Sequence, residues 1–174
     1  MNIQLRLPTV VTLSIEPSTT QYCEWDTVAL TAMPEGGNGN YTYEWTPATG
    51  LLSTTDSIVM VDTEEQNFTY HLVVTDGNGC TAQADFTLPE PSHLTVSAAQ
   101  QHIISCFEGR DGAVVATAEN GAEDYTYAWN NGTTGALCEN LPEGTYTVTA
   151  TDAYGCTATA SIDITHPTEL TATV

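Results

Sequence analysis

The feature that most constrains this chain is an internal repeat. The stretch YTYEW, Tyr41 to Trp45, recurs as YTYAW, Tyr125 to Trp129. The stretch TDGNGCTA, which starts at Thr75, recurs as TDAYGCTA, which starts at Thr151. Self-similarity over such a period is typical of tandem units that share one fold. The sequence therefore predicts two complete units, over residues 9–89 and 90–166.

The segments that flank the two units resemble parts of further units. Openers of similar sequence occur at Pro8 (PTVVTLS), Pro91 (PSHLTVS) and Pro167 (PTELTAT), and NIQLRLP near the start aligns with the closing runs ADFTLP and SIDITHP. We therefore expect residues 1–8 to be the closing strand of a preceding unit and residues 167–174 to be the opening strand of a following one. The apolar positions expected to make the contacts of these strands are Ile3, Leu5, Leu7, Leu170, Ala172 and Val174.

The hydrophobic pattern indicates a protein made almost entirely of β-strands. Runs such as TYHLVVTD, TYTVTATD and ATASIDIT alternate with period two and are rich in Thr, Val, Tyr and Ile. Turn-forming stretches such as GGNGN, DGNG, NNG and PEG separate them at short intervals. Six or seven short strands per unit predict two tandem immunoglobulin-like antiparallel β-sandwiches, with an extra flanking strand at each end.

The repeated aromatic motif is expected to supply the core of each unit. Trp45 and Trp129 lie centrally in their units, where a tryptophan on the third strand of a sandwich packs. The tyrosines two residues before each tryptophan should share its face of the strand. Trp25, next to Cys23 in CEWD, departs from this pattern and is expected to be exposed.

The charge of the chain limits its partners. It carries 22 acidic residues against two basic ones, Arg6 and Arg110, for a formal charge of −20. Nucleic acids and anionic membranes are both bound through Lys and Arg side chains. Because this chain has almost none, neither is expected as a partner. No stretch has the length and apolarity of a membrane span. The first residues lack the basic region and apolar run of a signal peptide, so we expect any export signal to lie on a longer precursor.

The five cysteines predict disulfides and an extracytoplasmic location. Cys23 and Cys80 occupy places in unit 1 that correspond to Cys106 and Cys156 in unit 2, which predicts the bridges Cys23–Cys80 and Cys106–Cys156. Cys138 is then left reduced, as a buried thiol on a short strand. A rival pairing of Cys138 with Cys106 would leave Cys156 free, and the sequence leaves this alternative open.

The second unit resembles a known repeat. The order C-x-x-G-x-D-G, YTYAW-x-NG and L-P-x-G-TY-x-V-x-x-TD-x-x-GC, which covers nearly all of residues 90–166, is similar to the SprB repeat of surface proteins in gliding and biofilm-forming Bacteroidota. Residues 9–89 resemble the related PKD-like or Ig-like modules through YTYEWTPATGL and TYHLVVTDGNGC, but lack the C-x-x-G-x-D-G start. The resemblance implies a large, secreted, modular cell-surface adhesin, used in adhesion, motility or matrix.

Catalysis is not expected, and calcium is the cofactor that the residues leave open. The four histidines are scattered, and no nucleophile stands in a motif with a base. Hard cations need several oxygen ligands at one place, and acidic turns offer Glu108 and Asp111 in FEGRDG, with Asp152 on a later turn. No EF-hand spacing occurs, so we expect weak stabilisation by Ca²⁺ at most.

Short motifs also mark candidate glycosylation positions. Asn40, Asn67 and Asn131 each begin an N-x-Thr triplet. The O-linked pattern known from the group that the resemblance names, Asp followed by Thr or Ser and an aliphatic residue, fits Thr27 and Ser57.

Two functions remain from different classes. The first is a structural or adhesive module of a secreted repeat protein or an extracellular filament, located outside the cell or at its surface. Its partners would be copies of itself or adjacent repeats in a linear polymer, and glycans. The second is a carbohydrate-binding accessory module of a secreted enzyme, which needs exposed aromatic side chains. Trp25 is the residue that separates the two readings.

Overall fold

The computed structural model describes residues 10–62 and 68–172, and the chain divides into unit 1, Met1–Pro91, and unit 2, Ser92–Val174. Unit 1 contains β1 (Thr12–Pro17), β2 (Thr27–Glu35), β3 (Thr42–Thr46), β4 (Ile58–Asp62), β5 (Thr69–Thr75) and β6 (Thr81–Thr87). Unit 2 contains β7 (Thr95–His102), β8 (Gly112–Glu119), β9 (Thr126–Trp129), β10 (Leu137–Leu141), β11 (Gly144–Thr151) and β12 (Thr157–Ile164).

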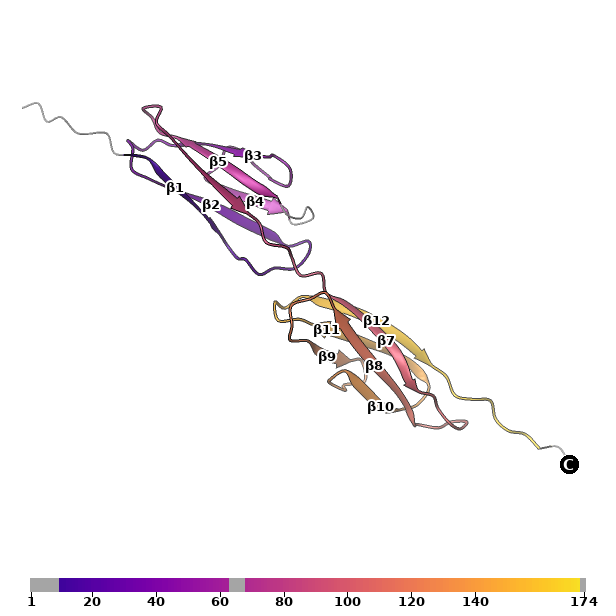
Figure 1. Ribbon diagram of the computed structural model, residues 1–174. Coiled ribbons are helices and arrows are strands. Elements are labelled where there is room, and N and C mark those ends of the chain that lie inside the picture. The colour runs from indigo at the N-terminus through magenta and orange to yellow at the C-terminus, as the bar shows by residue number, and fades with distance from the viewer. Residues whose placement is uncertain (1–9, 63–67, 173–174) are drawn as a thin grey trace, which may run out of the picture. The chain divides into compact units, whose positions relative to one another are not determined.

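The two units share one topology. In unit 1 the sheet β1-β2-β4 faces the sheet β3-β5-β6 (Figure 1), and in unit 2 the sheet β7-β8-β10 faces the sheet β9-β11-β12. The described strand pairs within these sheets are antiparallel. The first strand of each unit also contacts the last strand of that unit, β1 with β6 and β7 with β12. This is the strand arrangement of an immunoglobulin-like sandwich, so the all-β class predicted from the sequence is confirmed.

Alternation along the strands produces the core of each unit. In β5, Tyr70, Leu72 and Val74 are fully buried, while the residues between them are partly exposed. In β11, Tyr146, Val148 and Ala150 take the corresponding positions. Successive side chains of a strand point to opposite faces, so each strand contributes every second residue to the space between the sheets. Each fully buried valine or leucine stabilises the fold by roughly 1.5–3 kcal/mol.

The repeated tryptophans lie in the core, as predicted. Trp45 on β3 is 1% exposed and Trp129 on β9 is 4% exposed. Each indole N–H is satisfied by a backbone carbonyl of the following loop, that of Asp56 at 2.9 Å and that of Gly135 at 3.0 Å. A buried tryptophan needs such a partner for its N–H. The same solution in both units shows that the sequence repeat is also a repeat of local structure.

The tyrosine at the start of β11 anchors the loop before it. The Tyr146 hydroxyl donates a hydrogen bond of 3.0 Å to the carbonyl oxygen of Pro142. This contact corresponds to the tyrosine corner of immunoglobulin-like domains. Val148, two residues later, stands where antibody domains place a core cysteine, and Val114 on β8 faces the same core cluster. Apolar packing in this unit therefore takes the place of the inter-sheet disulfide.

Candidate functional site

The ends of the two sandwiches hold the residues that the sequence singled out. We call the end of a unit at which its first strand begins the leading end, and the end at which its last strand finishes the trailing end. In unit 1, Thr12 on β1 pairs with Glu35 on β2, so the start of β1 and the end of β2 share the leading end. In unit 2, Thr95 pairs with Glu119 in the same way.

A buried aspartate organises the leading end of unit 1. Asp76 is 4% exposed, and one oxygen of its carboxylate accepts hydrogen bonds from the backbone N–H groups of Asn78 at 2.9 Å and Cys80 at 2.8 Å. The other oxygen accepts from the N–H of Asn38 at 3.1 Å, in the turn that follows β2. The bond from Cys80, with the weaker contributions of the other two, lowers the pKa of Asp76 although burial opposes this.

Unit 2 repeats this arrangement around Asp152, which is 6% exposed. One carboxylate oxygen accepts from the N–H groups of Tyr154 and Cys156, both at 2.9 Å. The other accepts from the Ala122 N–H at 3.1 Å and from the Ser92 hydroxyl. Burial raises the pKa of Asp152, but these hydrogen bonds outweigh burial and lower it below the usual value. The aspartate therefore stays charged and ties two loops and the first residues of the unit together.

The close approach of each aspartate to a neighbouring loop requires a glycine there. A Cβ atom on Gly37 would lie 2.6 Å from a carboxylate oxygen of Asp76, and the φ of Gly37 is +60°. A Cβ atom on Gly121 would lie 3.0 Å from a carboxylate oxygen of Asp152 and 2.8 Å from Leu94. The glycines therefore allow the backbone to reach the carboxylate.

The trailing ends carry equivalent turns despite different sequences. In unit 1 the Cys23 carbonyl accepts from the Asp26 N–H at 3.1 Å, and in unit 2 the Cys106 carbonyl accepts from the Gly109 N–H at 3.0 Å. The second residue after each cysteine has positive φ, +73° at Trp25 and +55° at Glu108. The C-x-x-G-x-D-G motif of unit 2 is thus absent from unit 1 as a sequence, but the turn that it forms is present.

Each trailing-end turn is fixed by further hydrogen bonds. Asp26 accepts from the Cys23 N–H at 2.8 Å, and Asp111 accepts from the Ser105 N–H at 3.1 Å. The Tyr22 hydroxyl donates to the carbonyl of Pro89, just beyond β6, and burial raises the pKa of Tyr22 to about 12. In unit 1 the Tyr22 bond therefore holds the cysteine-bearing turn against the segment that follows β6.

The cysteine pairs predicted within the units are wrong. Cys23 and Cys156 are disulfide-bonded, whereas Cys80, Cys106 and Cys138 are free. The buried, unbonded state of Cys138 agrees with its prediction, and its sulfur accepts a hydrogen bond from the Asn131 amide at 3.3 Å.

The distances across each unit explain why the predicted pairs do not form. Cys23 precedes β2 at the trailing end, and Cys80 lies at the leading end, beyond the nine residues of β2. At 3.3 Å per residue this separates the two by about 30 Å. Cys106 and Cys156 are separated in the same way by the eight residues of β8, about 26 Å. A disulfide needs Cα atoms within roughly 7 Å.

The residues proposed to bind calcium do not come together either. Glu108 and Asp111 lie at the trailing end of unit 2, whereas Asp152 lies at the leading end. The carboxylate of Asp152 already accepts hydrogen bonds from backbone N–H groups. One ion cannot span β8 to reach both ends, so this trio is not a site. Among the described residues, no group of three or more His, Cys, Asp or Glu side chains could hold a metal ion. The expected weak response to Ca²⁺ stays a prediction.

The aromatic and glycosylation candidates have different surroundings. Trp25 is 66% exposed, as expected, at the trailing end of unit 1. Thr27, Ser57 and Asn40 are exposed, while Asn67 lies outside the described residues. The exposed Asn131 uses its side-chain oxygen to accept from the Thr133 N–H at 3.1 Å, within its own triplet. Glycosylation of these positions stays a prediction.

The proposed end strands are described only in part. Ile3, Leu5, Leu7 and Val174 lie outside the described residues. Leu170 is 98% exposed and Ala172 is exposed, and residues 165–172 join no sheet formed by the described part of the chain. The corresponding residues of the two units, Thr12 and Thr95, begin β1 and β7.

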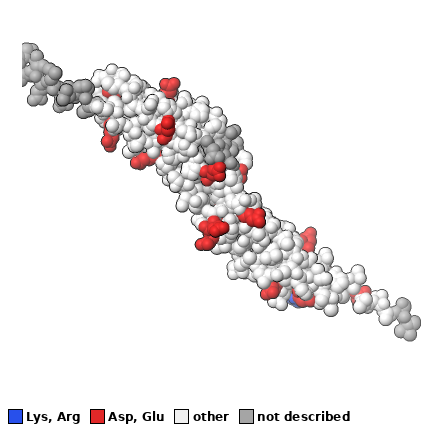
Figure 2. Space-filling model, in the orientation of Figure 1, with Lys and Arg blue, Asp and Glu red and all other residues white. Residues whose placement is uncertain are grey.

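Acidic side chains outnumber basic ones on the visible surface. Figure 2 shows Asp and Glu scattered over it in separate groups, with basic atoms at one small spot. No helix in residues 10–62 and 68–172 is long and apolar enough to cross a membrane.

Comparisons with known proteins agree with this architecture. Residues 104–134 match the family model described as SprB repeat. No match was found among curated protein sequences. Among solved structures, the chain is similar to the three N-terminal domains of the bacteriophage RB49 Highly Immunogenic Outer Capsid protein (Hoc). The TM-score is 0.54 at 21% identity, over 89% of this chain and 59% of that chain.

Two further solved structures are similar at lower TM-scores. One is the C-terminal 282-residue fragment of intimin in complex with the intimin-binding domain of its translocated receptor, with a TM-score of 0.49 at 17% identity, over 87% of this chain and 64% of that one. The other is the N-terminal eight Ig domains of Down Syndrome Cell Adhesion Molecule, with a TM-score of 0.48 at 13% identity, over 92% and 25%. The chain spans less than two thirds of the length of each of these three structures. This protein is therefore an all-β chain of Ig-like sandwiches, and residues 104–134 of its second unit are similar to the SprB repeat.

Proposed function

We propose that this chain is a non-enzymatic structural and adhesive module of a secreted surface protein or extracellular filament, joined head-to-tail to similar units through its end strands. The observation that carries the proposal is the correspondence between the flanking segments and strands that the structure describes. Leu170 and Thr171 align with Leu94 and Thr95, and β7 begins at Thr95. In β7 this segment pairs with β8 along its length.

The preceding flank supports the same proposal. When the openers at Pro8, Pro91 and Pro167 are superposed, Ile3 and Leu5 align with Phe86 and Leu88 of unit 1 and with Ile162 and Ile164 of unit 2, which pack on the cores of their units. A segment with this alternation needs a sheet beside it to bury its apolar face. A neighbouring unit, in one covalent array or in another chain by donor-strand complementation, would supply that sheet. Such a contact does not close on itself, so it builds a linear polymer.

The surface properties fit a protein that works outside the cell. The SprB-repeat match, the disulfide-bonded cysteines and the acidic surface all favour a secreted, cell-surface location. Many cell-surface proteins use the Ig-like fold to hold their binding surfaces at a distance from one another. We therefore place the module among extracellular adhesive or scaffolding proteins.

Deletion of the end segments tests the proposal. Chains that lack Asn2 to Leu7 and Glu169 to Val174 should remain monomeric at concentrations at which the full chain forms linear assemblies, as followed by light scattering and electron microscopy. Replacing Leu170 by Asp alone provides a matched variant that keeps the length. Assemblies of unchanged form from the trimmed chain would contradict the role of the end strands.

One observation favours a second candidate, a carbohydrate-binding accessory module. The Trp25 side chain is 66% exposed, and an exposed indole can stack on a sugar ring. Binding to a glycan array that disappears in Trp25→Ala would support this candidate. Equal behaviour of the parent chain and Trp25→Ala would argue against it.

A further inference from the structure

The free cysteines at the unit ends have the same placement as the bonded ones. Each unit has one cysteine at its leading end, Cys80 or Cys156, and one in the turn at its trailing end, Cys23 or Cys106. Cys23 and Cys156 are disulfide-bonded. Cys80 and Cys106 hold the corresponding positions in the opposite unit and carry free thiols. A position that forms a disulfide in one repeat therefore stands reduced in the other.

Both free thiols are accessible. Cys80 and Cys106 are exposed, in contrast to the buried Cys138. Cys80 lies at the end of a turn that Asp76 holds by two hydrogen bonds to the backbone. Cys106 lies in the turn closed by the Gly109 N–H. Each thiol is therefore presented on a fixed backbone at the end of a sandwich, which reduces the conformational entropy lost when a bridge forms.

The surroundings of Cys106 form a receptive surface. The thiol borders a pocket of about 440 Å³ lined by Ser105, Phe107, Pro167, Thr168 and Leu170. Phe107 is 41% exposed, and its ring contacts the His166 ring edge-on at 4.7 Å between centroids. Trp25 lies near Cys23 in the trailing-end turn of unit 1, so an exposed aromatic accompanies the trailing-end cysteine in both units. The apolar lining favours contact with another protein surface over open solvent.

We propose that Cys106 and Cys80 are the two halves of a head-to-tail disulfide between copies of this chain. The trailing-end thiol Cys106 of one copy bonds the leading-end thiol Cys80 of the next, with the Asp76–Cys80 turn seated against the Phe107 pocket. This inference rests on the proposed head-to-tail arrangement, and it adds a covalent bond to that arrangement. The two sites are different surfaces, so the linkage extends in one direction without closing.

The bond requires an oxidant, which we take to be a disulfide such as oxidised glutathione. The Cys106 thiolate attacks one sulfur of glutathione disulfide, which breaks the S–S bond and releases one glutathione as a thiol. The Cys80 thiolate of a second copy then attacks the Cys106 sulfur and displaces the second glutathione. Two protein thiols lose two electrons and two protons in total, and one oxidised glutathione becomes two reduced ones.

Complementary single variants test the pairing directly. Cys80→Ser and Cys106→Ser are each purified and incubated in a glutathione redox buffer, alone and as an equal mixture. Each variant alone should stay monomeric on a non-reducing gel, and the mixture should give a dimer that goes no further. The parent chain should give a ladder of oligomers. Peptide mapping should find Cys80 joined to Cys106, and mixing isotope-labelled with unlabelled chains should show that the two halves come from different copies.

Matched controls separate this bond from random oxidation. Cys138→Ala removes the buried thiol and should leave the ladder unchanged. The proposal is overturned if each variant alone dimerises as readily as the mixture, if Cys80 and Cys106 join within one copy, or if both remain thiols. A dimer in the mixture that survives removal of Asn2 to Leu7 and Glu169 to Val174 would keep the disulfide and contradict the end-strand linkage. Linear assemblies of the parent chain in which Cys80 and Cys106 remain thiols would contradict the disulfide and keep the end-strand linkage.

Discussion

At the scale of single residues, the repeated core tyrosine should contribute measurably to stability. Tyr146→Phe removes the hydroxyl that donates to the Pro142 carbonyl at 3.0 Å, while it keeps the buried ring. We expect the unfolding free energy of unit 2 to fall by about 1 kcal/mol, the usual net value of one such hydrogen bond. Chemical denaturation, followed by the fluorescence of Trp129, measures it.

A matched tyrosine provides the control for this prediction. Tyr154 is 42% exposed in the leading-end turn, so Tyr154→Phe should change the unfolding free energy far less. Equal effects of the two substitutions would show that the Tyr146 hydroxyl does not anchor the loop.

The leading-end aspartate makes stability depend on pH. The folded pKa of Asp152 is lowered, because the hydrogen bonds to its carboxylate outweigh burial. The charged form therefore stabilises the fold above the ordinary aspartate pKa of about 4. This contribution is lost as the pH falls through the lowered folded pKa. Asp152→Asn should lower the melting temperature at neutral pH and flatten its decline between about pH 5 and pH 2.

An exposed carboxylate tests whether the effect depends on burial. Asp163 on β12 is exposed and accepts one hydrogen bond from the Thr145 hydroxyl at 2.6 Å. Asp163→Asn should leave both the melting temperature at neutral pH and the acid limb nearly unchanged. If Asp152→Asn behaves in the same way, the hydrogen-bond network does not hold the leading end.

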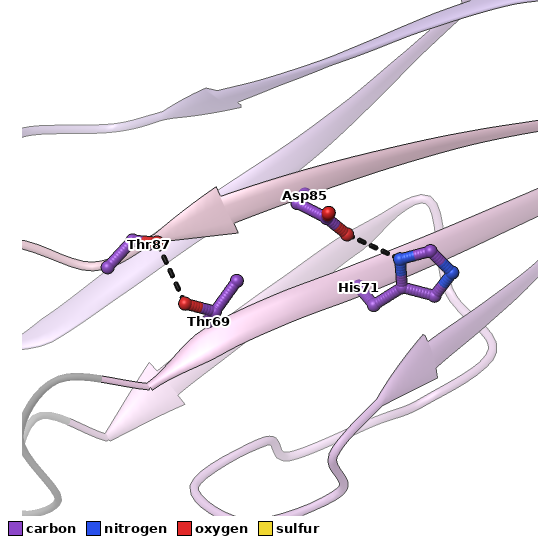
Figure 3. Close-up of polar contacts among 4 residues, drawn as sticks. All are labelled: Thr69, His71, Asp85 and Thr87. Atoms are coloured by element: carbon purple, nitrogen blue, oxygen red, sulfur yellow. Dashed lines mark hydrogen bonds and ion pairs between the residues drawn. The ribbon is translucent and has the colours of Figure 1, made fainter.

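At the scale of elements, polar pairs line the outer face of β5 and β6. His71 and Asp85 are direct cross-strand partners, and the Nδ1 atom of His71 contacts the Asp85 carboxylate (Figure 3). Thr69 and Thr87, the next pair on this face, share a hydrogen bond of 2.8 Å. The side chains of His71 and Asp85 are 41% and 64% exposed, so water competes with their attraction. The pairs fix the strand register but add little energy.

A double-mutant cycle quantifies the His71–Asp85 pair. The coupling free energy between His71→Ala and Asp85→Ala should be below about 1 kcal/mol and should shrink at high salt. The Thr69→Val and Thr87→Val cycle serves as an uncharged comparison that salt should not affect. A coupling of several kcal/mol at His71–Asp85 would show that this edge of the sandwich is held by charge.

The sequence predicts strands and core better than it predicts bonds between distant residues. Alternation in segments such as TYHLVVTD reports burial directly, so the sandwich, Trp45 and Trp129 were all predictable. The cysteine repeat established equivalent positions, but equivalence does not say which end of a strand a residue occupies. The nine residues of β2 separate Cys23, at the trailing end of unit 1, from Cys80, at the leading end.

The aspartate network was missed although the sequence contains a sign of it. The repeated TD-x-x-GC stretch places an aspartate before a tight turn, and aspartate side chains commonly accept hydrogen bonds from the backbone of such turns. What the stretch does not reveal is the second loop, whose Asn38 or Ala122 N–H completes the site from across the sandwich. Contacts of this kind depend on tertiary structure and leave no local pattern.

At the scale of the whole molecule, the two units carry equivalent ends. Both units repeat one topology, with an aspartate-bound turn at the leading end and a cysteine-bearing turn at the trailing end. Equivalent ends on the two units fit the proposed array, because one kind of joint would serve every pair of neighbouring units, as in other repeat proteins. The strong acidic charge of −20 disfavours lateral association between such arrays, because their surfaces repel.

The central claim is that residues 167–174 form the opening strand of a following unit. It is tested most directly by completing that unit, with a copy of residues 99–166 joined after Val174, because Val174 aligns with Ala98. Hydrogen exchange then compares Leu170 to Val174 in the original and extended chains. The account predicts fast exchange at Leu170 to Ala172 in the original chain and strong protection in the extended one, lost again when Leu170 is replaced by Asp. Fast exchange of this segment beside an otherwise folded third unit would contradict it.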